Sequence, residues 1–260
     1  MRLTVLGTGS AMPVPDRAQT GYLLEADDRR LLLDCGAGTL HRLAGTDAGY
    51  EGVGTVLLSH HHLDHVADLL PLLKARWLAG ETTLTVVGPP GTRDLVEGLL
   101  DVHDYLRGRV DLTLREVETA GGDGVDAGGD GAPSPEAAPF DVAGFEVRAF
   151  ETRHSMRCFA YRFDGLTISG DSEAFEGLAR FADGSEVLFH DCSFPDDVDV
   201  SNHPTPTQLG RVLAGRDVDR LYLTHLYPHT RGRLEEMVES VEAHFDGDVR
   251  VARDGLQVEA

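Results

Sequence analysis

Short apolar runs, many of them bounded by Gly, Pro or Asp, recur along this chain. Runs of this length, rich in Val, Ile, Leu and Phe, are typical of β-strands that turn residues separate. We expect strands at Leu3–Leu6, Gly21–Leu24, Leu31–Leu33, Thr55–Leu58, Leu84–Val87, Leu112–Val117, Phe145–Phe150, Phe159–Phe163, Leu166–Ile168, Val187–Phe189, Leu221–Thr224 and Val249–Ala252.

Other segments have the spacing of helices that bury one face. In Val66–Leu78, for example, leucines recur three and four positions apart. We expect helices at 66–78, 92–106, 173–181, 205–215 and 231–245. Strands that dominate both halves and alternate with helices predict an α/β fold.

The length and composition indicate one globular domain over 1–260. A chain of 260 residues of which 41% are hydrophobic can bury a sizeable core. One segment, about 119–139, is rich in Gly, Asp, Ala and Pro and has almost no large apolar residue. That composition predicts a flexible acidic insertion.

The chain also carries the marks of a cytoplasmic protein. It shows neither an apolar signal segment nor a stretch approaching 18 apolar residues, so we expect no contact with a membrane. The cysteines Cys35, Cys158 and Cys192 show no C-x-x-C spacing, and we expect them to be reduced and mostly buried.

The segment that carries chemistry follows the predicted strand at Thr55–Leu58. It contains His60, His62, Asp64 and His65 in the pattern H-x-H-x-D-H. Alternation along an extended segment turns His60 and His62 to one side, where both reach one cation, while the next two can face a second. Imidazole nitrogens with carboxylate oxygens suit zinc, and also manganese or iron.

This motif resembles the centre of the metallo-β-lactamase superfamily. The resemblance implies a four-layer αβ/βα sandwich of two mixed β-sheets flanked by helices, with Asp34 supporting the histidine loop. Later matches are Thr152–Ser155, Ile168–Ser172 and Leu221–His225. Within the superfamily, the segments Leu6–Ala11, Thr152–Ser155 and Ile168–Ser172 are most similar to the ribonuclease Z-like branch.

By this resemblance the chain binds two divalent metal ions. One is held by His60, His62 and His154, and the other by Asp64, His65 and His225, with Asp171 bridging. Such a pair generates a hydroxide nucleophile at neutral pH.

We expect Asp64 to be a catalytic residue as well as a metal ligand. By the same resemblance, His203 would contact the scissile phosphate or protonate the leaving oxygen, and Asp191 would orient it. The alternative for His203 is that it caps the helix that begins near Pro204.

The resemblance implies a phosphodiesterase acting on a small-molecule, nucleotide or RNA substrate, and the branch suggests a homodimer. Alternatives are a lactone or thioester hydrolase, a tRNA 3′-end endonuclease and a non-catalytic binding module. The basic arm of the tRNA-processing members is not visible in this sequence. The sequence contains all seven ligands of a two-metal site, which disfavours the non-catalytic binding module. It also disfavours the members of this superfamily that use a single iron ion to oxidise persulfides.

The charge of the chain favours a halophilic, haloarchaeal host. The alternative is a mesophile with a GC-rich genome, in which arginine displaces lysine, but this alone does not explain the acidic excess. There are 44 acidic against 23 basic residues, for a formal net charge of −21, and Lys74 is the only lysine. Self-repulsion of this size weakens the folded state in dilute buffer and is screened where the Debye length is about 3 Å, near 1 M salt.

We therefore expect the melting temperature to rise as KCl is raised from about 0.1 M to about 3 M, because salt screens the acidic surface. Thermal unfolding followed by circular dichroism measures this. A chain that is at least as stable without salt contradicts a halophilic origin.

Overall fold

The computed structural model describes residues 1–118, 136–198 and 200–260, and it contains two mixed seven-stranded sheets, each flanked by helices. The α/β class with two mixed sheets is thereby confirmed. Most of the predicted insertion at about 119–139 lies outside the described residues. In the described part of the chain, no helix combines the length and the apolar character needed to span a membrane.

The chain divides into two compact units. Residues 1–117, 142–145 and 253–259 form the first, and residues 118–141, 146–252 and 260 form the second. Each unit contains most or all of one sheet. That 1–260 acts as a single domain stays a prediction.

The first sheet is antiparallel at one edge and parallel at the other. Its order is β14 (Gln257–Glu259), β1 (Arg2–Gly7), β2 (Gly21–Ala26), β3 (Arg29–Leu33), β4 (Thr55–Leu57), β5 (Thr83–Gly88) and β6 (Asp111–Glu116). The pairs from β14 to β3 are antiparallel, and those from β3 to β6 are parallel. Parallel pairing needs crossover connections, which helices provide between β3 and β6.

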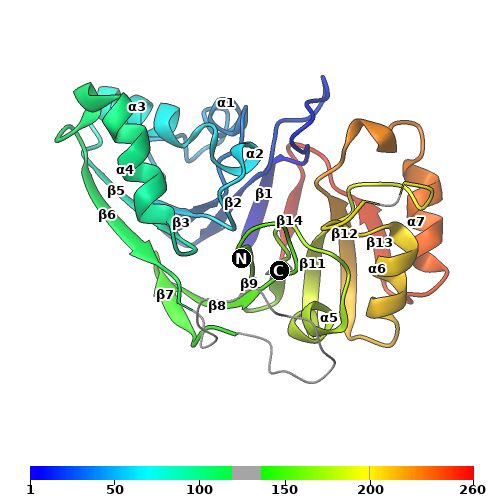
Figure 1. The fold of residues 1–260 in the computed structure, drawn as a ribbon. Coiled ribbons are helices and arrows are strands. Elements are labelled where there is room, and N and C mark those ends of the chain that lie inside the picture. The colour runs from blue at the N-terminus through cyan, green and yellow to red at the C-terminus, as the bar shows by residue number, and fades with distance from the viewer. Residues whose placement is uncertain (119–135, 199) are drawn as a thin grey trace. The chain divides into compact units, whose positions relative to one another are not determined.

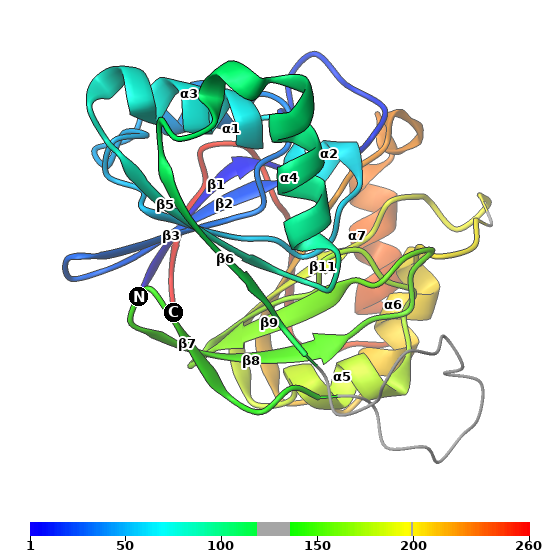
Figure 2. The same cartoon turned by 60° about the vertical axis from the view of Figure 1, so that its left-hand side comes forward.

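Those helices pack on one face of the first sheet. They are α1 (Thr39–Leu43), α2 (Leu63–Val66), α3 (Leu69–Ala79) and α4 (Thr92–Val102), followed by the 3-10 turn η1 (Asp104–Leu106). Figures 1 and 2 show α3 and α4 lying over β5 and β6. Leu72 of α3 and Leu100 of α4 belong to the same buried cluster as Val56 and Val86 of the strands. Burial of these apolar side chains drives the helices onto the sheet.

A buried arginine ties α3 to the loops around it. The Arg76 side chain is 2% exposed, and its guanidinium donates to the carbonyl oxygens of Tyr50, Glu51 and Thr83 at 2.7, 2.8 and 3.0 Å. Glu81 lies 3.7 Å away as an ion-pair partner. The charge is therefore buried with hydrogen bonds that offset its loss of water.

The second sheet has a similar plan. Its order is β13 (Asp248–Val251), β12 (Val218–Thr224), β11 (Ser185–Asp191), β10 (Leu166–Ile168), β9 (Phe159–Phe163), β8 (Phe145–Glu151) and β7 (Phe140–Val142). Strands β10 to β13 are parallel, while β8–β9 and β9–β10 are antiparallel. Strand β8 therefore runs in the same direction as β10.

Three helices cover one face of this sheet. They are α5 (Glu176–Ala182), α6 (Pro206–Leu213) and α7 (Leu234–Glu242), with the 3-10 turn η2 (Pro228–Thr230) before α7. Leu209 of α6 and Val241 of α7 share a buried cluster with Leu188 and Leu221 of β11 and β12. Figure 1 shows α6 and α7 beside β12 and β13.

Several predicted boundaries need correction. The helix predicted at 66–78 is two helices, α2 and α3, and α2 already begins at Leu63, so that Asp64 and His65 are helical. The helix predicted at 92–106 ends at Val102 and gives way to η1. Strands β7 and β14 and helix α1 were not predicted. These elements are short, and long-range pairing or packing rather than local pattern stabilises them.

Replacing Arg76 with Met is expected to lower the free energy of unfolding by about 3 kcal/mol, because three buried carbonyl groups lose a charged donor. Urea unfolding in high KCl measures the change. The matched control is Arg180→Met on α5, where the side chain is 64% exposed and the expected change is within about 0.5 kcal/mol. Equal stability of the two variants would show that the Arg76 contacts contribute nothing net.

Candidate metal centre

In the first unit the candidate ligands follow the carboxyl ends of two adjacent parallel strands. Asp34 comes directly after β3, and Ser59 is the second residue of the loop after β4. The strands pair Leu33 with Leu57, and the Asp34 amide donates to the Leu57 carbonyl at 2.9 Å. The end of one strand thus holds a carboxylate against the histidine loop that leaves the other.

Asp34 is a buried carboxylate with hydrogen bonds to both oxygens. Its Oδ1 accepts from the Ser59 amide at 2.7 Å, and its Oδ2 lies 2.7 Å from Ser59 Oγ and 2.8 Å from His65 Nδ1. The residue is 1% exposed and has a left-handed backbone, φ 58°. When His65 donates from Nδ1 to Asp34, its Nε2 keeps a lone pair for a metal ion.

The four motif residues lie close together. His60 Nε2 is 3.0 Å from His62 Nδ1, and His65 Nε2 is 3.8 Å from Asp64 Oδ2. His60, Asp64 and His65 are buried, and His62 is half-buried. Ligand atoms about 2 Å from a tetrahedral metal lie roughly 3 to 4 Å apart, so this donor set fits a divalent cation.

The two intervening residues of the motif, His61 and Leu63, have different surroundings. His61 Nε2 is 2.8 Å from Thr92 Oγ1 at the start of α4, and burial lowers the pKa of this imidazole. Leu63 is 79% exposed.

In the second unit the other candidate ligands also lie at or after the carboxyl ends of strands. Asp171 follows β10, Asp191 ends β11 and His225 follows β12, and these strands are parallel neighbours. His154 follows β8, which runs in the same direction. The carboxyl ends of these strands therefore bring the side chains to one edge of the sheet, where open α/β sheets bind ligands.

Asp171 lies between two imidazoles of the second unit. Its Oδ2 is 3.3 Å from His225 Nε2 and 3.8 Å from His154 Nε2. The Thr152 hydroxyl donates to the Asp171 carbonyl at 2.8 Å and so holds its backbone. His225 has a left-handed backbone, φ 57°, which is uncommon for a residue with a side chain and turns the chain sharply where β12 ends.

Asp191 orients His203 rather than offering free oxygens. Its Oδ2 lies 2.7 Å from His203 Nδ1 and 3.2 Å from the Ser172 amide, and its Oδ1 accepts from Ser193 Oγ at 2.6 Å. Asp191 is fully buried. Its ligand atom and those of Asp171, His203 and His225 lie within 4.8 Å of one another. These three donors nevertheless already surround the Asp191 carboxylate.

Sequence reasoning missed Ser193, which joins the two histidines of this cluster. Its Oγ is 2.9 Å from His225 Nδ1 as well as 2.6 Å from Asp191 Oδ1. A hydroxyl that donates to Asp191 and accepts from His225 Nδ1 leaves His225 Nε2 for a metal ion. The signal was present, because residues two apart in an extended segment share a face.

The structure also decides the alternative role that the sequence allowed for His203. The cap of α6 is Thr205, whose side chain accepts from the Gln208 amide while the Gln208 side chain accepts from the Thr205 amide. His203 is therefore not the cap, and its imidazole faces the cluster. The rings of His203 and His225 stack with centroids 5.4 Å apart, and that of His154 meets His203 edge-on at 5.3 Å.

The cysteines beside the motif aspartates are poor nucleophiles. Cys35 and Cys192 are fully buried, and burial raises the pKa of both thiols well above the ordinary value. A thiolate mechanism at neutral pH is disfavoured for either residue.

Comparison with known proteins identifies the family of the chain. The chain matches the family model described as Anti-Pycsar protein Apyc1 over residues 1–231. It is 30% identical over 290 residues to a ribonuclease Z of Mycobacterium bovis (strain BCG / Pasteur 1173P2), covering 100% of this chain and 98% of that protein. It is 28% identical to the probable metallo-hydrolase YhfI of Bacillus subtilis (strain 168), with 98% of each chain covered.

Solved structures show the same fold. The crystal structure of YhfI, a metallo-β-lactamase fold protein, matches with a TM-score of 0.80 and 25% identity over 100% of this chain and 99% of that one. The short form of human tRNase Z matches with a TM-score of 0.74 and 22% identity, again over 100% and 99%. The chain is thus a metal-dependent hydrolase of the metallo-β-lactamase fold in the ribonuclease Z-like branch, and it belongs to the Anti-Pycsar protein Apyc1 family.

Proposed function

We propose that the chain is a binuclear phosphodiesterase. In this proposal His60, His62 and His154 hold one divalent metal, and a second is held by Asp64, His65 and His225, with Asp171 bridging. Zinc is the expected metal, with manganese or iron as alternatives. A homodimer and a cytoplasmic location stay predictions.

The donor sets of both units support this proposal. In each unit, a hydrogen bond at Nδ1 orients an imidazole so that Nε2 is the nitrogen that would bind a metal: Asp34 does this for His65, and Ser193 for His225. Divalent metals bound there would polarise the phosphodiester and activate water for attack on it. These hydrogen bonds orient the ligand rings before any metal binds.

The observation that carries phosphodiester chemistry is the pair of His203 and Asp191. A carboxylate 2.7 Å from Nδ1 orients the His203 ring, so that a proton on Nε2 would be donated to a phosphate oxygen or to the leaving oxygen. The His203 side chain is 10% exposed, which shields this donor from bulk water.

A small diester suits the charge of the chain better than a polynucleotide does. A net charge of −21 repels polyanions at ordinary salt. The second candidate is a tRNA 3′-end endonuclease, which the 30% identity to a ribonuclease Z favours. Cleavage of a precursor tRNA with a 3′ trailer, compared with hydrolysis of bis(p-nitrophenyl) phosphate, discriminates between the two.

Replacing Asp171 with Ala is expected to lower hydrolysis of bis(p-nitrophenyl) phosphate about 1000-fold, because the bridging carboxylate contributes several kcal/mol through the metals. Metal content should fall from about two ions per chain. Elemental analysis and initial rates in high KCl measure both. The control is Asp246→Ala, which removes an exposed carboxylate of the second unit and should change neither quantity.

Wild-type protein with two metals and no phosphodiester cleavage would point to lactones or thioesters instead. Protein that binds no metal after incubation with zinc or manganese would contradict the proposed centre itself.

Replacing His203 with Ala is expected to lower kcat about 100-fold or more through loss of an acid, while metal content stays at the wild-type value. Asp191→Asn should lower kcat about 10- to 100-fold, because an amide no longer holds the same tautomer. Rates and elemental analysis on the same preparations test this. Loss of one metal ion in His203→Ala would make His203 a ligand rather than an acid.

A further inference from the structure

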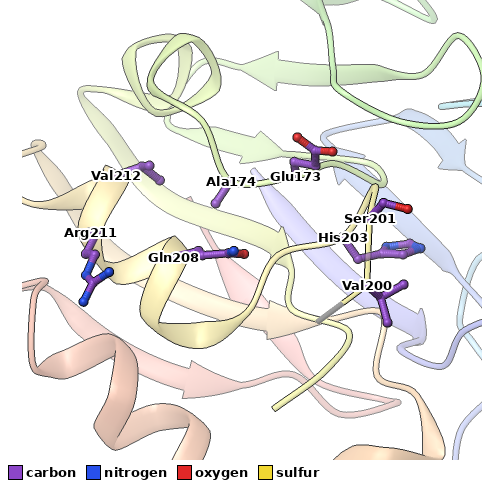
Figure 3. Close-up of a pocket in the computed structure, with 8 residues that line it drawn as sticks. All are labelled: Glu173, Ala174, Val200, Ser201, His203, Gln208, Arg211 and Val212. Carbon is purple, nitrogen blue, oxygen red and sulfur yellow. The ribbon is translucent and has the colours of Figure 1, made fainter. Parts of the chain in front are cut away.

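A pocket of about 400 Å³ opens beside His203 in the second unit. It is lined by Glu173, Ala174, Val200, Ser201, His203, Gln208, Arg211 and Val212. Pockets that hold small ligands begin at about 300 Å³, so this one is large enough for part of a substrate. Figure 3 shows His203 on one side and the residues of α6 on the other.

The α6 wall of the pocket offers hydrogen-bond donors. Gln208 and Arg211 are three positions apart on one helix and so lie on the same face. The Gln208 Oε1 accepts from the Thr205 amide at 3.0 Å, which leaves the amide nitrogen of this side chain as the donor for a ligand. In Figure 3 the Gln208 side chain points from α6 toward His203, and Arg211 lies further from His203 along the helix.

Arg211 differs from its neighbours in having no acidic partner among the described residues. In the same unit, Arg216 pairs with Glu176 at 2.6 Å, and Arg220 pairs with Asp248 at 3.3 Å. In a chain of net charge −21, an arginine that no described carboxylate neutralises is a local attraction for an anion. A guanidinium binds phosphate through two parallel hydrogen bonds.

The acidic group of the pocket is engaged on the opposite wall. Glu173 Oε1 accepts from the Asn202 amide at 3.3 Å and so supports the loop that carries His203. The Asn202 carbonyl in turn lies 3.2 Å from His154 Nδ1. Glu173 thus holds the loop at the His203 end, and the cationic end of the pocket is at Arg211.

We propose that this pocket binds the non-reacting part of the substrate and that Arg211, with the Gln208 amide, binds a second phosphate group on it. The inference rests on the proposed function, because it places the scissile phosphate at His203. Arg211 and Gln208 then determine specificity and take no part in bond cleavage. The preferred substrates are diesters that carry a further phosphate beyond the one that is cleaved.

The test compares two probes by calorimetry on metal-loaded protein, adenosine 3′,5′-bisphosphate and adenosine 5′-monophosphate. Wild-type protein is expected to bind the bisphosphate about 10-fold more tightly, as one charge-assisted contact at a partly exposed site would give. In Arg211→Gln this ratio should fall to about 1. Gln208→Glu keeps an acceptor for the Thr205 amide, and its added negative charge should lower the ratio as well.

Arg180→Gln, which makes the same change of net charge on the exposed side of α5, is the matched control and should keep the wild-type ratio. An unchanged ratio in Arg211→Gln, or equal binding of both probes by wild-type protein, overturns the inference. Hydrolysis of bis(p-nitrophenyl) phosphate by the same preparations separates it from the proposed function. If the protein hydrolyses the diester but Arg211→Gln leaves the affinity ratio unchanged, only the proposed phosphate site in the pocket is contradicted. If the ratio depends on Arg211 but no diester is hydrolysed, only the proposed phosphodiesterase activity is contradicted.

Discussion

Two buried carboxylates each hold one imidazole of this enzyme in place. Asp34 in the first unit and Asp191 in the second each sit at the carboxyl end of a parallel strand, accept from a serine hydroxyl and lie within 2.8 Å of a histidine Nδ1. Burying a carboxylate costs several kcal/mol unless its oxygens are satisfied. The hydrogen bonds that offset this cost also fix the rings, so the stability of these carboxylates and the geometry of the site depend on the same contacts.

The direction of the strands explains why the candidate ligands of each unit lie at one edge of its sheet. In each unit they follow parallel strands, or a strand that runs the same way, and so share one edge of one sheet. Left-handed backbone at Asp34 and His225 turns the chain where those strands end. Such conformations cost free energy and persist where surrounding contacts hold them, which here are the Ser59 and Ser193 hydrogen bonds.

The family membership favours an RNA substrate, whereas the acidic composition disfavours a polyanion. Relatives named ribonuclease Z act on RNA, whereas a chain of net charge −21 needs high salt or a local cation to approach a phosphate ester. The His203 imidazole and the Arg211 guanidinium supply positive or protonatable groups at opposite ends of one pocket. Local placement of a few cationic groups can therefore serve a substrate that the whole surface repels.

The sequence by itself determined the fold class, the order of most strands and the identity of the candidate ligands, because strand patterns and the H-x-H-x-D-H motif are local. The break between α2 and α3, and the short strands β7 and β14, escaped it, since the contacts that stabilise them come from distant residues. The family resemblance already paired Asp191 with His203, and the tertiary structure gave the 2.7 Å contact between them. Only the tertiary structure showed that Ser193 joins this pair to His225 and that Arg211 shares a pocket with His203. These contacts depend on how the ends of β11 and β12 and the start of α6 are placed beside one another, which the pairing of the strands and the packing of α6 decide.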